Sequence, residues 1–232
     1  MTAFHFGSRQ RRLFGYYEPA PANASKMQAA LLCHPMGNEQ VFAYRSMRQL
    51  AARLVRAGFH VLRFDYFGTG DSYGDTGEGD LASWCDDIET AIEELKEITG
   101  AAKVDLVGLR LGANLSARVA CQSPREINKL VLWEPLDDEL ALATCKRPGP
   151  CANGGTTETE IVKGFARSAI SNKATLLPSP TLLLLTEPPP SPAEFGAITV
   201  EHVTDVPAWI EDRLTTGSIS TAALQRIVDW LQ

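Results

Sequence analysis

The chain has 232 residues, enough for one domain with a sizeable core, and its 44% hydrophobic content is typical of globular proteins. Its 22 Lys and Arg against 28 Asp and Glu give a net charge of −6, which excludes a basic field for nucleic acid. No apolar run approaches the ~20 residues that span a bilayer, and MTAFHFGSRQRR lacks a signal peptide's apolar region. We therefore expect a cytoplasmic protein without membrane or nucleic-acid partners, and we expect no metal and no cofactor.

The first half of the chain predicts strands separated by helices. Residues 4–19 indicate two short strands around a polar turn, and 28–33 form a third strand, followed by the loop HPMGNE. Apolar residues at helical spacing predict a helix over 42–57, which Gly58 should end. A strand over 60–65 and a glycine-rich loop over 66–80 follow.

The middle of the chain continues the same alternation. A helix is predicted over 81–99, ended by Gly100, and then a strand over 103–108. A helix over 111–121 and a strand over 129–133 come next. Strands alternating with helices at this spacing predict an α/β fold, with a mostly parallel central sheet and helices on both faces.

The alternation breaks after Trp133. Residues 136–180 are polar and rich in Gly, Pro and Thr, with one weak helical pattern near 158–170, so we expect a reduced cap inside a single domain that spans 1–232. The sheet resumes at 181–186 and ends with a strand over 197–203. A last helix is expected over 218–232, with Ser218 or Ser220 as its N-cap.

Three motifs occur in register with these elements: HPMG (34–37), FDYFGTGDS (64–72) and GLRLG (108–112). Together with the element order, they resemble the α/β-hydrolase fold over nearly the whole chain. HPMG resembles an oxyanion loop, and GLRLG lies where the G-x-S-x-G nucleophile elbow belongs. The combination also resembles a bacterial subgroup of the serine aminopeptidase type, associated with exosortases and biosynthetic clusters. That resemblance implies descent from esterases, thioesterases or peptidases.

The resemblance implies a serine, a histidine and an acid, and two of these three are missing. Arg110 occupies the serine position, and a guanidinium has no lone pair with which to attack a carbonyl. The loop after the last strand, TDVPAWIED, contains no histidine, and His202 lies inside that strand unless its register is misassigned. The acid position is Glu187, after the strand predicted over 181–186, or Glu134, after the strand predicted over 129–133.

Two interpretations of Arg110 stay open, because a buried unpaired guanidinium is costly and needs an anion. A carboxylate of the protein itself, from Glu134, Glu187 or Asp71, would pair with Arg110 and close the site. Alternatively, Arg110 binds the carboxylate or phosphate of a ligand, together with the backbone N–H groups of Leu111 and Met36.

His34 is the one base expected at the pocket, and its simpler interpretation is a histidine that braces the loop. The catalytic candidates are therefore His34, Arg110, Glu134 and Glu187. The ligand-binding candidates are Arg110, Leu111, Met36, His34 and Asp71.

The favoured hypothesis is a divergent pseudo-hydrolase, acting as a ligand-binding or accessory protein in a small-molecule biosynthetic pathway. Its partner would be a small anionic or acyl ligand, or another protein. The alternative is an active hydrolase, acyl-transfer or lyase-type enzyme that uses Arg110, His34 and the oxyanion loop in place of a triad.

Overall fold

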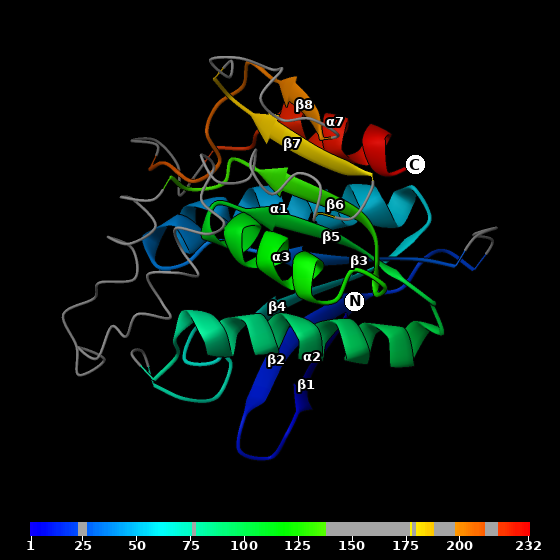
Figure 1. Cartoon of the computed structure of the whole chain (residues 1–232), viewed down its shortest axis with the longest axis vertical. Coiled ribbons are helices and arrows are strands. Elements are labelled where there is room, and N and C mark those ends of the chain that lie inside the picture. The colour runs from blue at the N-terminus through cyan, green and yellow to red at the C-terminus, as the bar shows by residue number, and fades with distance from the viewer. Residues whose placement is uncertain (23–26, 76–77, 138–176, 178–179, 188–197, 212–217) are drawn as a thin grey trace.

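The structure is a computed structural model that describes residues 1–22, 27–75, 78–137, 177, 180–187, 198–211 and 218–232. Eight strands form one sheet, and four described helices cover it (Figure 1). In chain order the elements are β1 (Thr2–Gly7), β2 (Arg12–Glu18), β3 (Gln28–Cys33), α1 (Asn38–Arg56), β4 (Phe59–Asp65), α2 (Leu81–Thr99), β5 (Val104–Leu109), α3 (Leu111–Gln122), β6 (Ile127–Trp133), β7 (Thr181–Leu185), β8 (Thr199–His202) and α7 (Thr221–Leu231).

The sheet has the strand order β1-β2-β4-β3-β5-β6-β7-β8. The β1–β2 hairpin joins β4 in antiparallel fashion, and the strands from β4 to β8 pair in parallel. Parallel strands place their carboxyl ends at one edge of the sheet, so the loops that follow β3, β5 and β6 gather there. The predicted mostly parallel α/β sheet is confirmed.

Each face of the sheet carries its own hydrophobic core, with α2 and α3 on one face and α1 and α7 on the other (Figure 1). Helix α1 contributes a buried stripe that includes Ala43, Met47, Leu50 and Leu54. Helix α2 contributes Leu81, Cys85, Ile88, Ile92 and Leu95 to the opposite core. The apolar residues that recur at helical spacing in the sequence are therefore the residues that these helices bury against the sheet.

The predicted ends of two helices are confirmed, and so is the N-cap position of the last helix. Gly58 follows α1 with φ 100°, and Gly100 caps α2 with φ 74°, in the left-handed region that glycine adopts readily. At α7, Ser220 occupies the N-cap position, but its hydroxyl donates to the carbonyl oxygen of Val206. The carboxylate of Asp205 caps this helix instead, at 2.7 Å from the N–H of Ala222 and 3.0 Å from that of Ala223.

Most of the expected cap, 136–180, including the weak helix near 158–170, lies outside the described residues. Among the described helices, none is long and apolar enough to cross a membrane.

Candidate functional site

The turn between β5 and α3 has the geometry of a strand–elbow–helix. Arg110 stands at the turn with φ 56° and ψ −123°, and its carbonyl oxygen accepts the N–H of Ala113 at 2.9 Å. A positive φ in a residue other than glycine is strained, at a cost of roughly 1–3 kcal/mol. Such strain persists only where the surrounding structure enforces it.

Two glycines enforce this turn. A Cβ at Gly108 would lie 2.4 Å from the carbonyl oxygen of Gly112, and a Cβ at Gly112 would lie 2.3 Å from that of Cys33. The first turn of α3 therefore packs directly on the backbone that leaves β3. The GLRLG motif is explained by close backbone approach at both glycines.

The guanidinium of Arg110 is held by an internal carboxylate. Its Nε donates to both carboxylate oxygens of Glu39, at 3.1 and 3.3 Å, and its Nη2 donates to Oε1 at 3.0 Å. Its central carbon also lies 4.9 Å from the ring centroid of Trp209. The Arg110 residue is 9% exposed, so its charge is neutralised by protein groups rather than by water.

An internal carboxylate was one of the two interpretations of Arg110, but the carboxylate that binds it belongs to Glu39 and not to Glu134, Glu187 or Asp71. Glu39 was assigned to the loop HPMGNE, whereas α1 already begins at Asn38, after Gly37 with φ 64°. Glu39 is thus an acidic residue in the first turn of a helix, where the helix dipole favours negative charge.

The acid candidates lie at the carboxyl ends of β6 and β7. Glu134 follows β6 with φ 48° and is buried. Its Oε2 accepts two hydrogen bonds from Thr186, one from the backbone N–H at 2.8 Å and one from the side-chain hydroxyl at 3.3 Å. Glu187 follows β7 and is exposed. The side chain of Glu134 therefore links the end of β6 to the end of β7.

His202 is the last residue of β8, as the sequence predicted for a histidine inside the strand. Its Nε2 lies 2.9 Å from the carbonyl oxygen of Thr186, so it donates there. A nitrogen that donates to a backbone carbonyl cannot at the same time accept the proton of a nucleophile.

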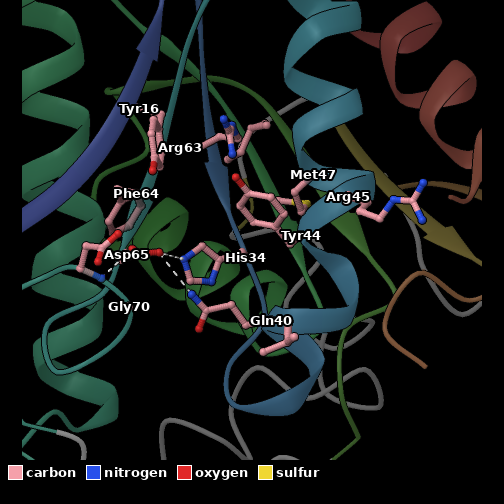
Figure 2. Close-up of a pocket in the computed structure, with 13 residues that line it drawn as sticks. Tyr16, His34, Gln40, Tyr44, Arg45, Met47, Arg63, Phe64, Asp65 and Gly70 are labelled. Atoms are coloured by element: carbon pink, nitrogen blue, oxygen red, sulfur yellow. Dashed lines mark hydrogen bonds and ion pairs between the residues drawn. The ribbon is translucent and has the colours of Figure 1, made fainter. Parts of the chain in front are cut away.

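His34 lies at the end of β3 beside Asp65, which ends β4 (Figure 2). Its Nδ1 lies 2.8 Å from the carbonyl oxygen of Pro35, and its Nε2 lies 3.4 Å from Oδ1 of Asp65 without the alignment of a hydrogen bond. Burial works to raise the pKa of Asp65, but His34, the N–H of Asp71 and Arg63 outweigh it, so this pKa is lowered. Since a carbonyl oxygen only accepts, Nδ1 of His34 donates to Pro35.

The structure brings together only part of the predicted ligand-binding set. His34 and Asp71 line one cavity of about 620 Å³, whereas Arg110, Leu111 and Met36 are not among its lining residues. Leu111 and Met36 are 1% and 2% exposed. Among the lining residues that sequence analysis missed, Tyr16, Tyr44 and Arg63 come from three separate elements, β2, α1 and β4, and no local motif links them.

Beneath the elbow, Cys33 and Ser116 are fully buried. Burial raises the pKa of the Cys33 thiol to about 12, and the hydroxyls of Ser116 and Tyr66 lower it only in part. Because the thiolate is the reactive form, Cys33 does not supply a replacement nucleophile.

The strand order and the glycine-enforced elbow are those of the α/β-hydrolase fold. Residues 25–139 match the model of the serine aminopeptidase family, S33. Among curated proteins, none matches the chain in sequence.

Solved structures support the same fold. The chain is similar to Est1E from Butyrivibrio proteoclasticus with ferulic acid bound, with a TM-score of 0.70, 15% identity, and coverage of 99% of this chain and 96% of that one. It is also similar to a thioesterase domain from the curacin biosynthetic pathway, with a TM-score of 0.66, 15% identity, and coverage of 100% and 99%. A proline iminopeptidase from Mycobacterium smegmatis gives a TM-score of 0.63, 12% identity, and coverage of 99% and 97%. At these identities the likeness shows the fold alone.

Proposed function

We propose that this chain is a non-hydrolytic α/β-hydrolase, in which Glu39, Arg110 and Trp209 occupy the place of a catalytic apparatus. The observation that carries the proposal is the pairing at the elbow of Arg110 with Glu39, in which Nε and Nη2 donate to the carboxylate. An arginine there cannot form an acyl intermediate, and its charge is already matched by a carboxylate. This pairing also removes the main reason for an anionic ligand at Arg110.

The protein would then act by binding rather than by turnover. The similar structures include Est1E with ferulic acid bound and a thioesterase domain of a biosynthetic pathway, which supports acyl compounds as the ligand class and a biosynthetic setting. An accessory role beside another protein of such a pathway requires no catalysis at the elbow.

The competing possibility is chemistry by His34, which lies beside Asp65 and lines a cavity. A general base needs an accessible lone pair within reach of its substrate. In this structure Nδ1 is at the carbonyl of Pro35 and Nε2 faces Asp65, so neither nitrogen is presented to a ligand. The geometry therefore favours a bracing role for His34.

The test is hydrolysis of p-nitrophenyl acetate, p-nitrophenyl butyrate and an acyl thioester by the purified chain, with an active esterase as the positive control. We expect rates equal to those of buffer for the chain and for the variant Arg110→Ser. A fluorophosphonate probe followed by intact mass should add nothing to either protein.

Two outcomes would overturn the proposal. Turnover by the unaltered chain that His34→Ala abolishes and Arg110→Ala leaves unchanged would establish chemistry at His34. Esterase activity gained in Arg110→Ser alone would reveal a base within reach of residue 110, and the companion variant His202→Ala would show whether that base is His202.

A further inference from the structure

A cavity of about 620 Å³ opens on the α1 face of the sheet, between the first turns of α1 and the strands β2 and β4 (Figure 2). This volume is within the usual range for sites that enclose a small organic molecule. The lining residues are Tyr16, Leu32, His34, Gln40, Val41, Tyr44, Arg45, Met47, Arg63, Phe64, Asp65, Gly70 and Asp71. Since Glu39, Arg110 and Trp209 are not among them, the cavity is separate from the cluster that these three residues form at the elbow.

The walls of the cavity are suited to a flat apolar body. Leu32 and Met47 are buried core residues, and Tyr16 and Tyr44 contribute aromatic rings from β2 and α1. Val41 and Tyr44, one helical turn apart, are 60% and 48% exposed, so apolar surface continues from the cavity onto the outside of α1. Aromatic side chains with apolar neighbours favour offset or edge contacts with an aromatic ring.

Two residues that line this cavity have a buried polar atom without a hydrogen-bond partner among the described residues: His34 at Nε2 and Arg63 at Nε. Arg63 is 7% exposed, and its Nη2 lies 3.3 Å from Oε1 of Glu18, while its Nε has no hydrogen-bond partner among the described residues. Figure 2 shows the Arg63 side chain beside Tyr16 and Tyr44, and its central carbon lies 5.2 Å from the ring centroid of Tyr16. Because Arg63 lines the cavity, a ligand oxygen beside its guanidinium would gain a charge-assisted hydrogen bond.

The charges around the cavity are balanced, and this excludes a strong preference for an anion. Arg45 and Arg63 bring two positive charges, and Asp65 and Asp71 bring two negative charges. Arg63 is also paired with Glu18, and the guanidinium of Arg45 points away from the other lining side chains in Figure 2. A ligand carboxylate would therefore meet Asp65 and Asp71, while Arg63 is already paired with Glu18 and the Arg45 guanidinium points away.

We propose that this cavity binds an uncharged aromatic compound that carries a carbonyl oxygen. The ring would pack between Leu32, Met47 and the two tyrosines, and the carbonyl oxygen would accept an N–H of the Arg63 guanidinium. This inference names a site and a ligand class for the binding role, but it does not depend on the elbow being inert, because the cavity and the elbow share no residue.

The probes are 7-methoxycoumarin, an uncharged aromatic lactone, and its matched acid 7-methoxycoumarin-3-carboxylic acid, at pH 7.5. Fluorescence anisotropy of each probe is measured while the full chain is titrated. We expect saturable binding of the lactone and at least tenfold weaker binding of the acid, because the acid brings a charge that the cavity does not compensate.

Three variants locate the site. Arg63→Met removes the N–H donor and should weaken binding of the lactone at least fivefold. Because this variant also leaves Glu18 unpaired, a second variant avoids the core: Val41→Trp, at an exposed position, should obstruct the cavity and weaken binding at least fivefold. Ile98→Trp is the matched control, since Ile98 is 40% exposed on α2 at the opposite face of the sheet, and it should bind as the unaltered chain does. Circular dichroism and thermal melting confirm folding of each variant.

The proposal is overturned if the lactone does not saturate, if Val41→Trp and Ile98→Trp bind it equally, or if the acid binds more tightly than the lactone. Each of these results leaves the ester and thioester assays untouched. Failure of this site and failure of the non-hydrolytic assignment are thus distinguished by separate measurements.

Discussion

The guanidinium of Arg110 lies over the indole of Trp209, with its central carbon 4.9 Å from the ring centroid. Trp209 belongs to the loop after β8, the loop in which the α/β-hydrolase resemblance predicts a catalytic histidine. The two positions that would hold nucleophile and base therefore contact each other as a cation and an aromatic face. Glu39 completes the cluster from α1, so three distant segments meet at the elbow.

Trp209 should stabilise the fold through this contact and through its packing on Trp133, whose ring centroid is 6.5 Å away. We expect Trp209→Ala to lower the free energy of unfolding by about 3–4 kcal/mol, since a large buried aromatic side chain and a cation–π contact are lost. Trp209→Phe keeps an aromatic face and should cost about half as much. Urea denaturation followed by circular dichroism measures both, and equal losses would show that the contact with Arg110 is unimportant.

The Glu39–Arg110 pair is expected to be coupled rather than additive. Glu39→Gln leaves the Arg110 guanidinium buried without a counter-charge and should destabilise the chain by about 3 kcal/mol. Adding Arg110→Met removes that uncompensated charge, so the double variant should recover at least about 1 kcal/mol relative to Glu39→Gln. A double-mutant cycle from urea midpoints gives the coupling energy, and a value near zero would contradict the pairing.

The sheet and its helices could be predicted because their signals are local. Buried strands appear as apolar runs, and α1 and α2 show their buried stripes at helical spacing, with Gly58 and Gly100 at the ends. The start of α1 was placed too late, because the apolar periodicity begins at Phe42 while the helix begins at Asn38. Because the predicted helix began four residues too late, Glu39 was assigned to a loop and was not considered as the partner of Arg110.

The remaining features depend on contacts between distant segments. Asp205 caps α7 from the loop after β8, and a local rule pointed to Ser218 or Ser220. The cavity near His34 is formed by β2, β4 and α1, and its unpartnered Arg63 Nε is visible only once burial is known. Sequence patterns specify which residues are buried along one element, but they do not specify which polar groups meet across elements.

Close backbone packing at the elbow predicts a sharp difference between two glycines. Gly112→Ala would place a Cβ 2.3 Å from the carbonyl oxygen of Cys33, so α3 or the backbone after β3 must move, and we expect a loss above about 3 kcal/mol or failure to fold. Gly100→Ala meets no atom within 4 Å and carries only the cost of φ 74°, about 1 kcal/mol. Thermal melting compares the two, and similar melting temperatures would contradict the tight elbow.

Asp105 should make the stability of the chain depend on pH. It is 2% exposed in β5, and burial raises its pKa from 3.8 to about 6, although Asn128 and Lys129 lower it in part. Because the folded state holds this proton to higher pH than the unfolded state, its contribution is fully present below pH 3.8 and is lost as pH rises through 6. The difference between the two limits is about 3 kcal/mol.

The variant Asp105→Asn isolates this effect, because it is neutral at every pH and can still accept the bond from Nδ2 of Asn128, now 2.7 Å from Oδ1. We expect Asp105→Asn to be more stable than the unaltered chain by about 2–3 kcal/mol at pH 8 and by less than about 0.5 kcal/mol at pH 4. Urea titrations of both proteins at the two pH values give the comparison, in which other titrating groups such as Asp65 cancel. A stability difference that is the same at pH 4 and pH 8 would show that Asp105 titrates at its ordinary pKa in the folded chain.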